Sequence, residues 1–335
     1  MDIKEKARIF LSIRIAHIGA GEWSRYAHGP TLQRLAQRSV VSLELICDLQ
    51  LERARKFCDL FGYRTASDNV HPALEAARPD AIVCTVQPSA TAALVRSLLP
   101  LGIPLFIEKP PGVSLNEAIS LAAAADAAGA ATFVAFNRRF IPSIVRLKQW
   151  ADRHSVGFAR AEMLRTNRLE PDFAVATGIH ALDAIRFLMG NPESIEVMSR
   201  PIANSEACDY SARLNFKDST VAEISMMLNT GLRREFYCLN ADGATADATL
   251  GSPYSSDFSF QGDRQWSGEK ILEEHHLTND ALIDGGFLGE HEEFLSLLAS
   301  GDTSTYSLRD AAYSMQLAEA VQNRFSGRLA PLFSE

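Results

Sequence analysis

A lysine that could take part in catalysis lies in the stretch PLFIEKPPG, residues 104–112. The apolar run from Leu105 to Ile107 predicts a short buried strand, and Glu108 and Lys109 follow at its carboxyl end. In open α/β sheets the ligand crevice lies outside the carboxyl ends of the strands, so we expect Lys109 to reach a cleft. Pro110 then stiffens the turn. A surface lysine in a strand-to-helix turn is the alternative for this segment alone.

A glycine turn follows the first apolar strand, residues 13–19. Its sequence GAGEWS has the spacing G-x-G-x-x-G, with Ser24 in the place of the third glycine. Gly19 would allow the tight turn, and Gly21 would let a pyrophosphate approach backbone N–H groups at a helix amino terminus. Ser24 is small enough for close packing of that helix on the strand. The turn therefore predicts a dinucleotide site.

An acid closes the second predicted strand, Leu43 to Cys47, and that acid is Asp48. A carboxylate at this point can accept hydrogen bonds from both ribose hydroxyls, and its charge would repel a 2′-phosphate. We therefore expect NAD as the cofactor in preference to NADP. Asp48 could also cap the helix that follows, and the two roles are compatible.

Strands and helices that could position these residues alternate from residue 13 to residue 137. Short apolar strands and helices of this length predict right-handed βαβ crossovers and a doubly wound parallel sheet. Six strands are expected, at residues 13–19, 43–47, 61–65, 81–86, 105–107 and 132–136.

The pattern changes after Asn137. A helix to about residue 152, a strand at 157–165 and a helix from about 172 to 189 are followed by strand-like runs between 193 and 277, whose turns predict a mostly antiparallel sheet. Helices at 291–298 and 308–325 close the chain. We expect an α/β protein with two domains, residues 1–137 for the dinucleotide and 138–335 for substrate and oligomer contacts.

The composition argues against several classes of function. The formal net charge is -8 with no dense basic run, which is unfavourable for nucleic-acid binding. The five cysteines show no C-x-x-C spacing, and several lie in apolar runs where a reduced thiol is usual. There is neither a run of 18 apolar residues nor a cleavable leader pattern. We therefore expect a cytoplasmic protein that contacts neither membrane nor nucleic acid.

Four motifs together resemble the Gfo/Idh/MocA oxidoreductases, the family of glucose-fructose oxidoreductase and inositol dehydrogenase. These motifs are GAGEWS, FIEKP, FNRRFIP and TGIHALD, and the resemblance covers nearly the whole chain. It implies an N-terminal Rossmann domain, a C-terminal α/β domain built on a large sheet, and a homodimer or homotetramer. It also implies hydride transfer between a nicotinamide and a sugar, polyol or related carbonyl.

The resemblance also implies roles for individual residues. Lys109 would stand beside the reacting carbon and stabilise developing alkoxide charge, with Glu108 holding it and a cis bond before Pro110 fixing the turn. His180 would be the acid/base residue, since its ring can take and return a proton at cellular pH. The implied cofactor-binding residues are Gly19, Gly21, Glu22, Trp23, Ser24, Asp48, Glu108, Lys109 and Pro110. No metal is expected.

Two positions depart from the family pattern. Members usually carry an acid four residues before the histidine, where this chain has Ala176, which can neither orient His180 nor relay its proton. Asp172 lies one turn further back, on about the same face. It is two helical turns, about 12 Å, from His180, which is too far for direct contact. A histidine that usually lies seventeen residues before the EKP glutamate is replaced by Thr91.

Several polar residues are candidates for substrate binding. Arg165 and Arg168 precede the His180 helix and could hold a carboxylate or phosphate by bidentate hydrogen bonds, although two solvated loop arginines are an equal alternative. Asp183 shares a helix face with His180 and could orient it. The remaining candidates are Arg139 and Tyr254.

The leading interpretation is an oxidoreductase that uses NAD on a sugar, polyol or sugar derivative. Two alternatives stay open. Some relatives keep the dinucleotide site but act as sensors or co-regulators, which the loss of the acid at Ala176 favours. Others hydrolyse glycosides through a transient oxidation with tightly held NAD. Retention of Lys109 and His180 favours catalysis over sensing.

Overall fold

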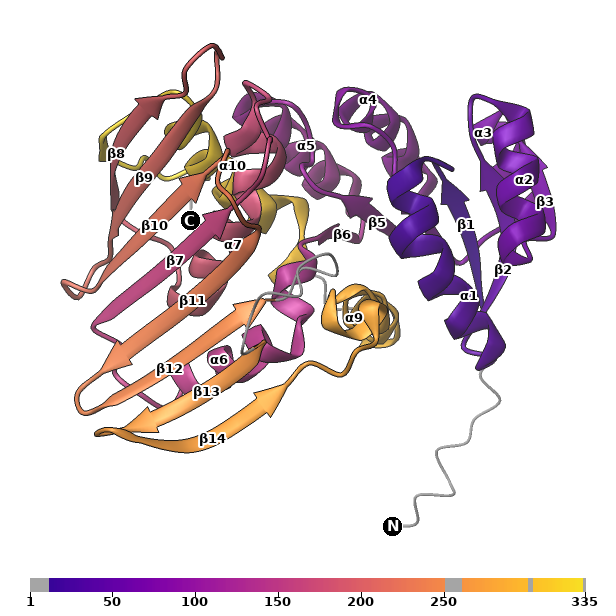
Figure 1. The fold of residues 1–335 in the computed structure, drawn as a ribbon. Helices are drawn as coiled ribbons and strands as arrows, with labels where there is room; N and C mark the ends of the chain where they lie inside the picture. The colour runs from indigo at the N-terminus through magenta and orange to yellow at the C-terminus, as the bar shows by residue number, and fades with distance from the viewer. Residues whose placement is uncertain (1–11, 251–260, 301–303, 334–335) are drawn as a thin grey trace. The chain divides into compact units, whose positions relative to one another are not determined.

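The protein is described by a computed structural model that covers residues 12–250, 261–300 and 304–333. The chain divides into two compact units. The first holds residues up to 112, 117–135 and 290–309, and the second holds 113–116, 136–289 and 310 onward. Figure 1 traces the elements of both along the chain.

The first unit is built on a six-stranded sheet in which every pairing is parallel. The strand order is β3-β2-β1-β4-β5-β6. Successive strands are added on one side of β1 up to β3 and on its other side from β4 onward, as in doubly wound dinucleotide folds. The strands are β1 (Ile13–Ile18), β2 (Val41–Cys47), β3 (Thr65–Ser67), β4 (Ala81–Cys84), β5 (Leu105–Glu108) and β6 (Thr132–Ala135).

Helices connect these strands and cover them. β4, β5 and β6 are buried along their whole length, as expected for parallel strands with helices on both faces. The connecting elements are a π-helix η2 (Ser24–His28), α1 (Gly29–Gln37), α2 (Leu51–Phe61), α3 (Val70–Ala77), α4 (Pro88–Leu98), η3 (Leu99–Leu101) and α5 (Leu115–Ala128).

The second unit is built on a nine-stranded sheet in the order β14-β13-β12-β11-β7-β10-β9-β8-β15. All its pairings are antiparallel except that between β7 and β10. The strands are β7 (Phe158–Leu164), β8 (Ser194–Pro201), β9 (Cys208–Asn215), β10 (Val221–Met227), β11 (Arg234–Ala241), β12 (Ala244–Leu250), β13 (Gly262–Ser267), β14 (Lys270–His276) and β15 (Gly327–Arg328).

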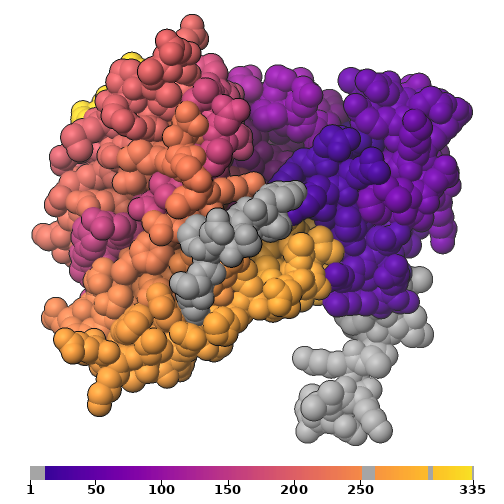
Figure 2. Space-filling view, in the orientation of Figure 1, coloured from indigo at the N-terminus to yellow at the C-terminus, as the bar shows by residue number. Residues whose placement is uncertain are grey.

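Helices pack on one face of this sheet. α6 (Pro142–Ala151) contacts β12 and β13, and α7 (Ile179–Met189) contacts β7 and β10. Burial alternates along β10 and β11, and strands of this sheet, coloured pink to orange, form part of the surface that Figure 2 shows. The other elements are η4 (Asn137–Phe140), a π-helix η5 (Ala174–Gly178), α8 (Ala281–Asp284), α9 (Phe287–Ser300), η6 (Ser304–Tyr306) and α10 (Leu308–Gln322).

The predicted fold class is confirmed: a parallel doubly wound sheet is followed by a larger, mostly antiparallel sheet. The third strand lies at Thr65–Ser67, later than the 61–65 run that predicted it, because α2 extends through Phe61 and ends at Gly62 in the left-handed conformation. None of the helices that the structure describes is long and apolar enough to cross a membrane.

Candidate active site

The glycine turn between β1 and η2 leaves room for a ligand on its backbone. Gly19 has a φ of +105°, and a Cβ there would lie 2.6 Å from the carbonyl oxygen of Thr85, so this position requires glycine. A Cβ on Gly21 would meet nothing within 4 Å. Open space beside Gly21, at the start of a helix, fits the approach of a pyrophosphate to backbone N–H groups.

Asp48 lies at the end of β2 and is tied to the glycine turn. Its Oδ2 accepts the backbone N–H of Ala20 at 2.9 Å, and its Oδ1 accepts the N–H of Gln50 and the Arg53 guanidinium. Burial would raise the pKa of Asp48, but these hydrogen bonds and the charge of Arg53 hold it below its ordinary value. The carboxylate therefore stays ionised beside the turn.

Ser24 is locked in the core beneath the turn. Its hydroxyl bonds Nε2 of His17 at 2.9 Å, and Nδ1 of His17 bonds the hydroxyl of Tyr63 at 2.8 Å. His17 lies on β1 and is fully buried, and burial, followed by the neighbouring His28, lowers its pKa well below the ordinary value. Ser24 thus has a hydrogen-bonding role that a third glycine could not fill.

A single π-turn brings two donors to the carboxylate of Glu108. Trp23 Nε1 and His28 Nε2 each lie 2.8 Å from Glu108 Oε1. Trp23 and His28 are five residues apart, a spacing that lies on one face only where the helix follows the π pattern, as η2 does. The first helix is thereby bonded to the carboxyl end of β5.

Lys109 follows Glu108 in a turn with a buried backbone. Pro110 and Pro111 are buried while Lys109 is half-buried, and the Lys109–Pro110 bond is cis, as predicted. Burial would raise the pKa of Glu108, but the hydrogen bonds from His28 and Trp23, with the Lys109 ammonium nearby, hold it below its ordinary value. Glu108 is therefore an anion that attracts Lys109.

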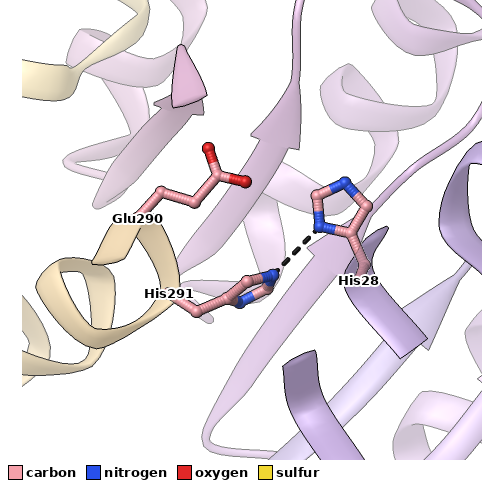
Figure 3. Close-up of side chains that lie close together, drawn as sticks. All are labelled: His28, Glu290 and His291. Atoms are coloured by element: carbon pink, nitrogen blue, oxygen red, sulfur yellow. Dashed lines mark hydrogen bonds between the residues drawn. The ribbon is translucent and has the colours of Figure 1, made fainter. Parts of the chain in front are cut away.

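A second histidine and a glutamate adjoin His28 in the same unit (Figure 3). Nδ1 of His28 lies 3.0 Å from Nε2 of His291, and the His291 ring stacks on Phe106 with centroids 4.4 Å apart. Glu290 is also buried, and one donor atom from each of the three residues falls within 4.8 Å of the others. The residue types suit zinc, but the two rings already bond each other.

His180 lies in the first turn of α7 and is buried, with 6% of its surface exposed. The π-helix η5 precedes it and contains Ala176. A Cβ on Gly178 would lie 2.7 Å from the sulfur of Met226 on β10, so glycine allows this helix start to approach the sheet. This close packing of Gly178 on β10 fixes the position of His180 at the start of α7.

Asp183 and Arg139 form a buried ion pair in the second unit. Arg139 Nε and Nη2 donate to the two carboxylate oxygens of Asp183 at 2.9 and 2.6 Å, and the Ser314 hydroxyl donates to Oδ1 at 2.6 Å. Asp183 is 0% exposed, and Arg139 pairs also with Asp310. This arrangement holds η4 against α7.

Arg165 and Arg168 have different surroundings. Arg165 is buried, donates to Glu235 and also bonds the carbonyl of Leu164 at 2.9 Å, so it is not a solvated loop arginine. Arg168 is 43% exposed at its side chain and donates to the Thr177 hydroxyl at 2.8 Å. Thr177 lies three residues before His180, so Arg168 is linked to the start of that helix.

The sequence matches the pattern of one family in two parts. Residues 13–136 match the oxidoreductase family, NAD-binding Rossmann fold, and residues 170–330 match the C-terminal alpha/beta domain of the same family, Gfo/Idh/MocA. The two matches together cover most of the chain.

The chain belongs to the Gfo/Idh/MocA oxidoreductase family.

Relatives agree with this membership. The D-glucoside 3-dehydrogenase of Escherichia coli is 24% identical over 196 residues, 54% of this chain and 55% of that protein. The chain thus aligns with about half the length of the curated relatives it matches.

Solved structures of similar fold include a Gfo/Idh/MocA family oxidoreductase from Vibrio cholerae, with a TM-score of 0.79 at 21% identity over 93% of this chain and 98% of that one. Another is an oxidoreductase from Agrobacterium radiobacter in complex with NAD+, L-tartaric acid and magnesium, with a TM-score of 0.74 at 17% identity over 94% and 96%. At these identities the likeness shows the fold alone.

Within this Gfo/Idh/MocA chain, sequence reasoning missed several residues of the site. His17, His28 and His291 are isolated in the sequence, and the π-turn that brings His28 to Glu108 has no signal at the 3.6-residue period. Glu235 could have been suspected, since it is an acid in a strand next to two arginines. Tyr254 lies outside the described residues.

Proposed function

We propose that the protein is an NAD-dependent dehydrogenase or reductase that acts on a CH–OH group of a sugar, polyol or sugar derivative. The observation that carries the proposal is the double hydrogen bond of Glu108 to Trp23 and His28. It joins the carboxyl end of β5, which carries Lys109, to the helix that begins at the glycine turn.

The residues of the first unit fit a dinucleotide. Gly19 and Gly21 give the tight turn and the open backbone for a pyrophosphate, and Asp48, which is bonded to this turn, would accept hydrogen bonds from the ribose hydroxyls. Its ionised carboxylate would repel a 2′-phosphate, which favours NAD over NADP. Glu22, Trp23 and Ser24 complete the turn. When bound, the nicotinamide accepts or supplies the hydride.

Two side chains would act on the substrate. The Lys109 ammonium, held by the Glu108 carboxylate, would hydrogen-bond the substrate oxygen and stabilise negative charge as it develops there. His180 would take the hydroxyl proton during oxidation and return it during reduction. Ala176 stands where the family usually has an acid, so no carboxylate at that position orients the His180 ring.

Relatives suggest the substrate class. One acts on a D-glucoside and another was solved with L-tartaric acid, which favours polyhydroxylated substrates. Arg139 and Asp183 are left out of the proposed substrate site, because they are buried against each other. Arg165 and Arg168 remain in it.

We also propose a homodimer or homotetramer whose subunits meet through the open face of the nine-stranded sheet. Side chains on this face of β10 and β11 are only partly buried in the single chain. A reducing, cytoplasmic location fits five cysteines that are all free thiols. No metal is proposed, since Nδ1 of His28 and Nε2 of His291 bond each other.

The test is a dehydrogenase assay of the purified protein with NAD+ or NADP+ against matched sugars, polyols and sugar acids. Reduction of NAD+ by at least one compound, with Lys109→Met inactive yet still binding NADH, would support the proposal. NADH binding without turnover of any compound would favour a sensor. Release of a sugar from a glycoside without net NADH would favour a redox-assisted hydrolase.

A further inference from the structure

Arginines gather at one end of two central strands of the nine-stranded sheet, where β7 ends and β11 begins. Arg234 pairs with Leu164 across these strands, so the next residues outward, Arg165 and Arg233, lie at the same end of the strands. Arg168 follows in the loop after β7, where its N–H bonds the carbonyl of Leu228. Three parts of the second unit contribute these arginines: η4 carries Arg138, the loop after β7 carries Arg165 and Arg168, and Arg233 directly precedes β11.

Two glutamates partly balance these charges. Glu235 is buried and accepts from Arg138, at 2.6 Å, and from Arg165. Burial would raise the pKa of Glu235, but these two arginines hold it far below its ordinary value. Glu170 pairs with Arg168. Four guanidinium groups therefore face two carboxylates.

Two positive charges remain, and Arg233 carries one of them. Its side chain is exposed, and within the described ranges it makes neither an ion pair nor a hydrogen bond. Partial desolvation of its guanidinium group, followed by the charge of Arg165, lowers the pKa of Arg233; Arg138 and Arg168 add to the effect and Glu235 opposes it. Arginines that repel one another in this way are stabilised by an anion.

Arg165 offers a second unused donor. Its Nε is buried and has no hydrogen-bond partner among the residues that the structure describes. Its side chain is 3% exposed. A buried N–H without an acceptor costs free energy, and an oxyanion is the acceptor that guanidinium groups bind best.

We propose that Arg233, Arg165 and Arg168 form a binding site for an anionic group of the substrate, a carboxylate or a phosphate. The substrate is then a sugar acid or a sugar phosphate. This inference rests on the proposed function and specifies that the substrate carries a negative charge.

The hydrogen bond from Arg168 to Thr177 connects the proposed anion site to the helix that carries His180. Thr177 lies one turn before His180, so an anion held by Arg168 and Arg233 is anchored at the amino-terminal side of that helix. A substrate fixed at its charged end would present a hydroxyl group to His180. Planar guanidinium forks suit this anchoring better than lysines, because each can make two parallel bonds to one oxyanion.

The experiment is calorimetric titration of the NADH-loaded protein with compounds in charged and neutral pairs. The pairs are D-gluconate with D-glucitol, D-glucuronate with D-glucose, and D-glucose 6-phosphate with D-glucose. We expect at least one anionic compound to bind tenfold or more tightly than its neutral partner, and the pair that shows the effect distinguishes carboxylate from phosphate.

Two variants complete the experiment. Arg233→Gln should weaken binding of that anion by about tenfold, and its exposed side chain is not needed for folding. Arg213→Gln, an equal loss of charge on β9 with the side chain 48% exposed, should leave binding unchanged. Anionic compounds that bind no better than their neutral partners would overturn the proposal, as would equal effects of the two variants. Turnover of a neutral compound with NAD+ in that case would leave the proposed function standing.

Discussion

Nε2 of His28 lies 2.8 Å from Oε1 of Glu108, and both side chains are buried. This bond joins the first helix to the carboxyl end of β5, the two elements that would contact the dinucleotide and the reacting oxygen. A change at either residue is therefore expected to reach Lys109 as well as the fold.

Two substitutions of Glu108 should separate the contribution of its hydrogen bonds to stability from that of its charge. Both Trp23 and His28 donate to the same oxygen, Oε1, so Glu108→Gln can keep both hydrogen bonds. Its free energy of unfolding should therefore lie within about 1 kcal/mol of the wild-type value. Glu108→Ala leaves the buried Nε2 of His28 and the partly exposed Nε1 of Trp23 without an acceptor, and should lower the free energy of unfolding by about 1 to 3 kcal/mol. Urea unfolding measures both.

Glu22 provides the control for that series. Glu22 directly precedes Trp23 in the glycine turn and is exposed, so Glu22→Ala should change the free energy of unfolding by less than about 0.5 kcal/mol. Equal losses in Glu108→Ala and Glu22→Ala would show that the shared carboxylate does not hold these elements together.

Cofactor preference should depend on Asp48. Fluorescence titration should show tighter binding of NADH than of NADPH, because the carboxylate repels a 2′-phosphate. Asp48→Ser should narrow the difference between the two affinities, whereas Asp80→Ser, at the exposed residue just before β4, should not. Equal affinities in the unchanged protein would contradict the assignment.

Buried histidines should make stability fall between pH 7 and pH 5. Burial lowers the pKa of His17 and His291 well below the ordinary 6.5, so below that pH the unfolded chain binds protons that the folded chain does not. Each contributes stability that is present above about pH 6.5 and lost as the pH falls, at up to about 1.4 kcal/mol per pH unit.

The histidine effect can be isolated. Asp48, Glu108 and Glu235, whose pKa values are lowered, lose their contribution only below about pH 4.5, near the pKa of a carboxyl in the unfolded chain. His291→Asn should flatten the slope measured by urea unfolding, and the exposed His71→Asn should not. A stability that stays constant from pH 7 to pH 5 would show that the buried rings take up protons as readily as in the unfolded chain.

Chelation should leave the His28 and His291 pair intact. Because Nδ1 of His28 bonds Nε2 of His291, dialysis against EDTA should not change the melting temperature. A fall of several degrees that stoichiometric zinc restores would instead identify a metal site with Glu290 as the third ligand.

Much of the first unit could be predicted because its signals are local. The glycine spacing, the apolar strand before Lys109 and the acid after the second strand are each readable within a few residues, and each lies where its pattern implied. The fully buried strands of a parallel sheet produce continuous apolar runs that a sequence shows plainly.

The parts that could not be predicted depend on long-range contacts. His28 meets His291 across more than 260 residues of sequence, and Glu235 meets Arg165 between antiparallel strands. The π-turns before His28 and His180 follow no period that apolar spacing reveals. Arg165, which could equally have been a solvated loop residue, is buried only because β11 supplies its carboxylate.

Steady-state kinetics of two variants test whether Lys109 carries more of the catalytic rate than His180. Lys109 acts on charge that appears in the transition state, a contribution worth about 10² to 10³ in rate, whereas His180 lacks an acid at Ala176 and should contribute near the lower end of 10² to 10⁴. On the substrate found in the screen, Lys109→Met should therefore lower kcat more than His180→Ala while NADH binding stays nearly intact. A larger loss in His180→Ala would mean that another group orients the histidine, and wild-type turnover by Lys109→Met would contradict the account.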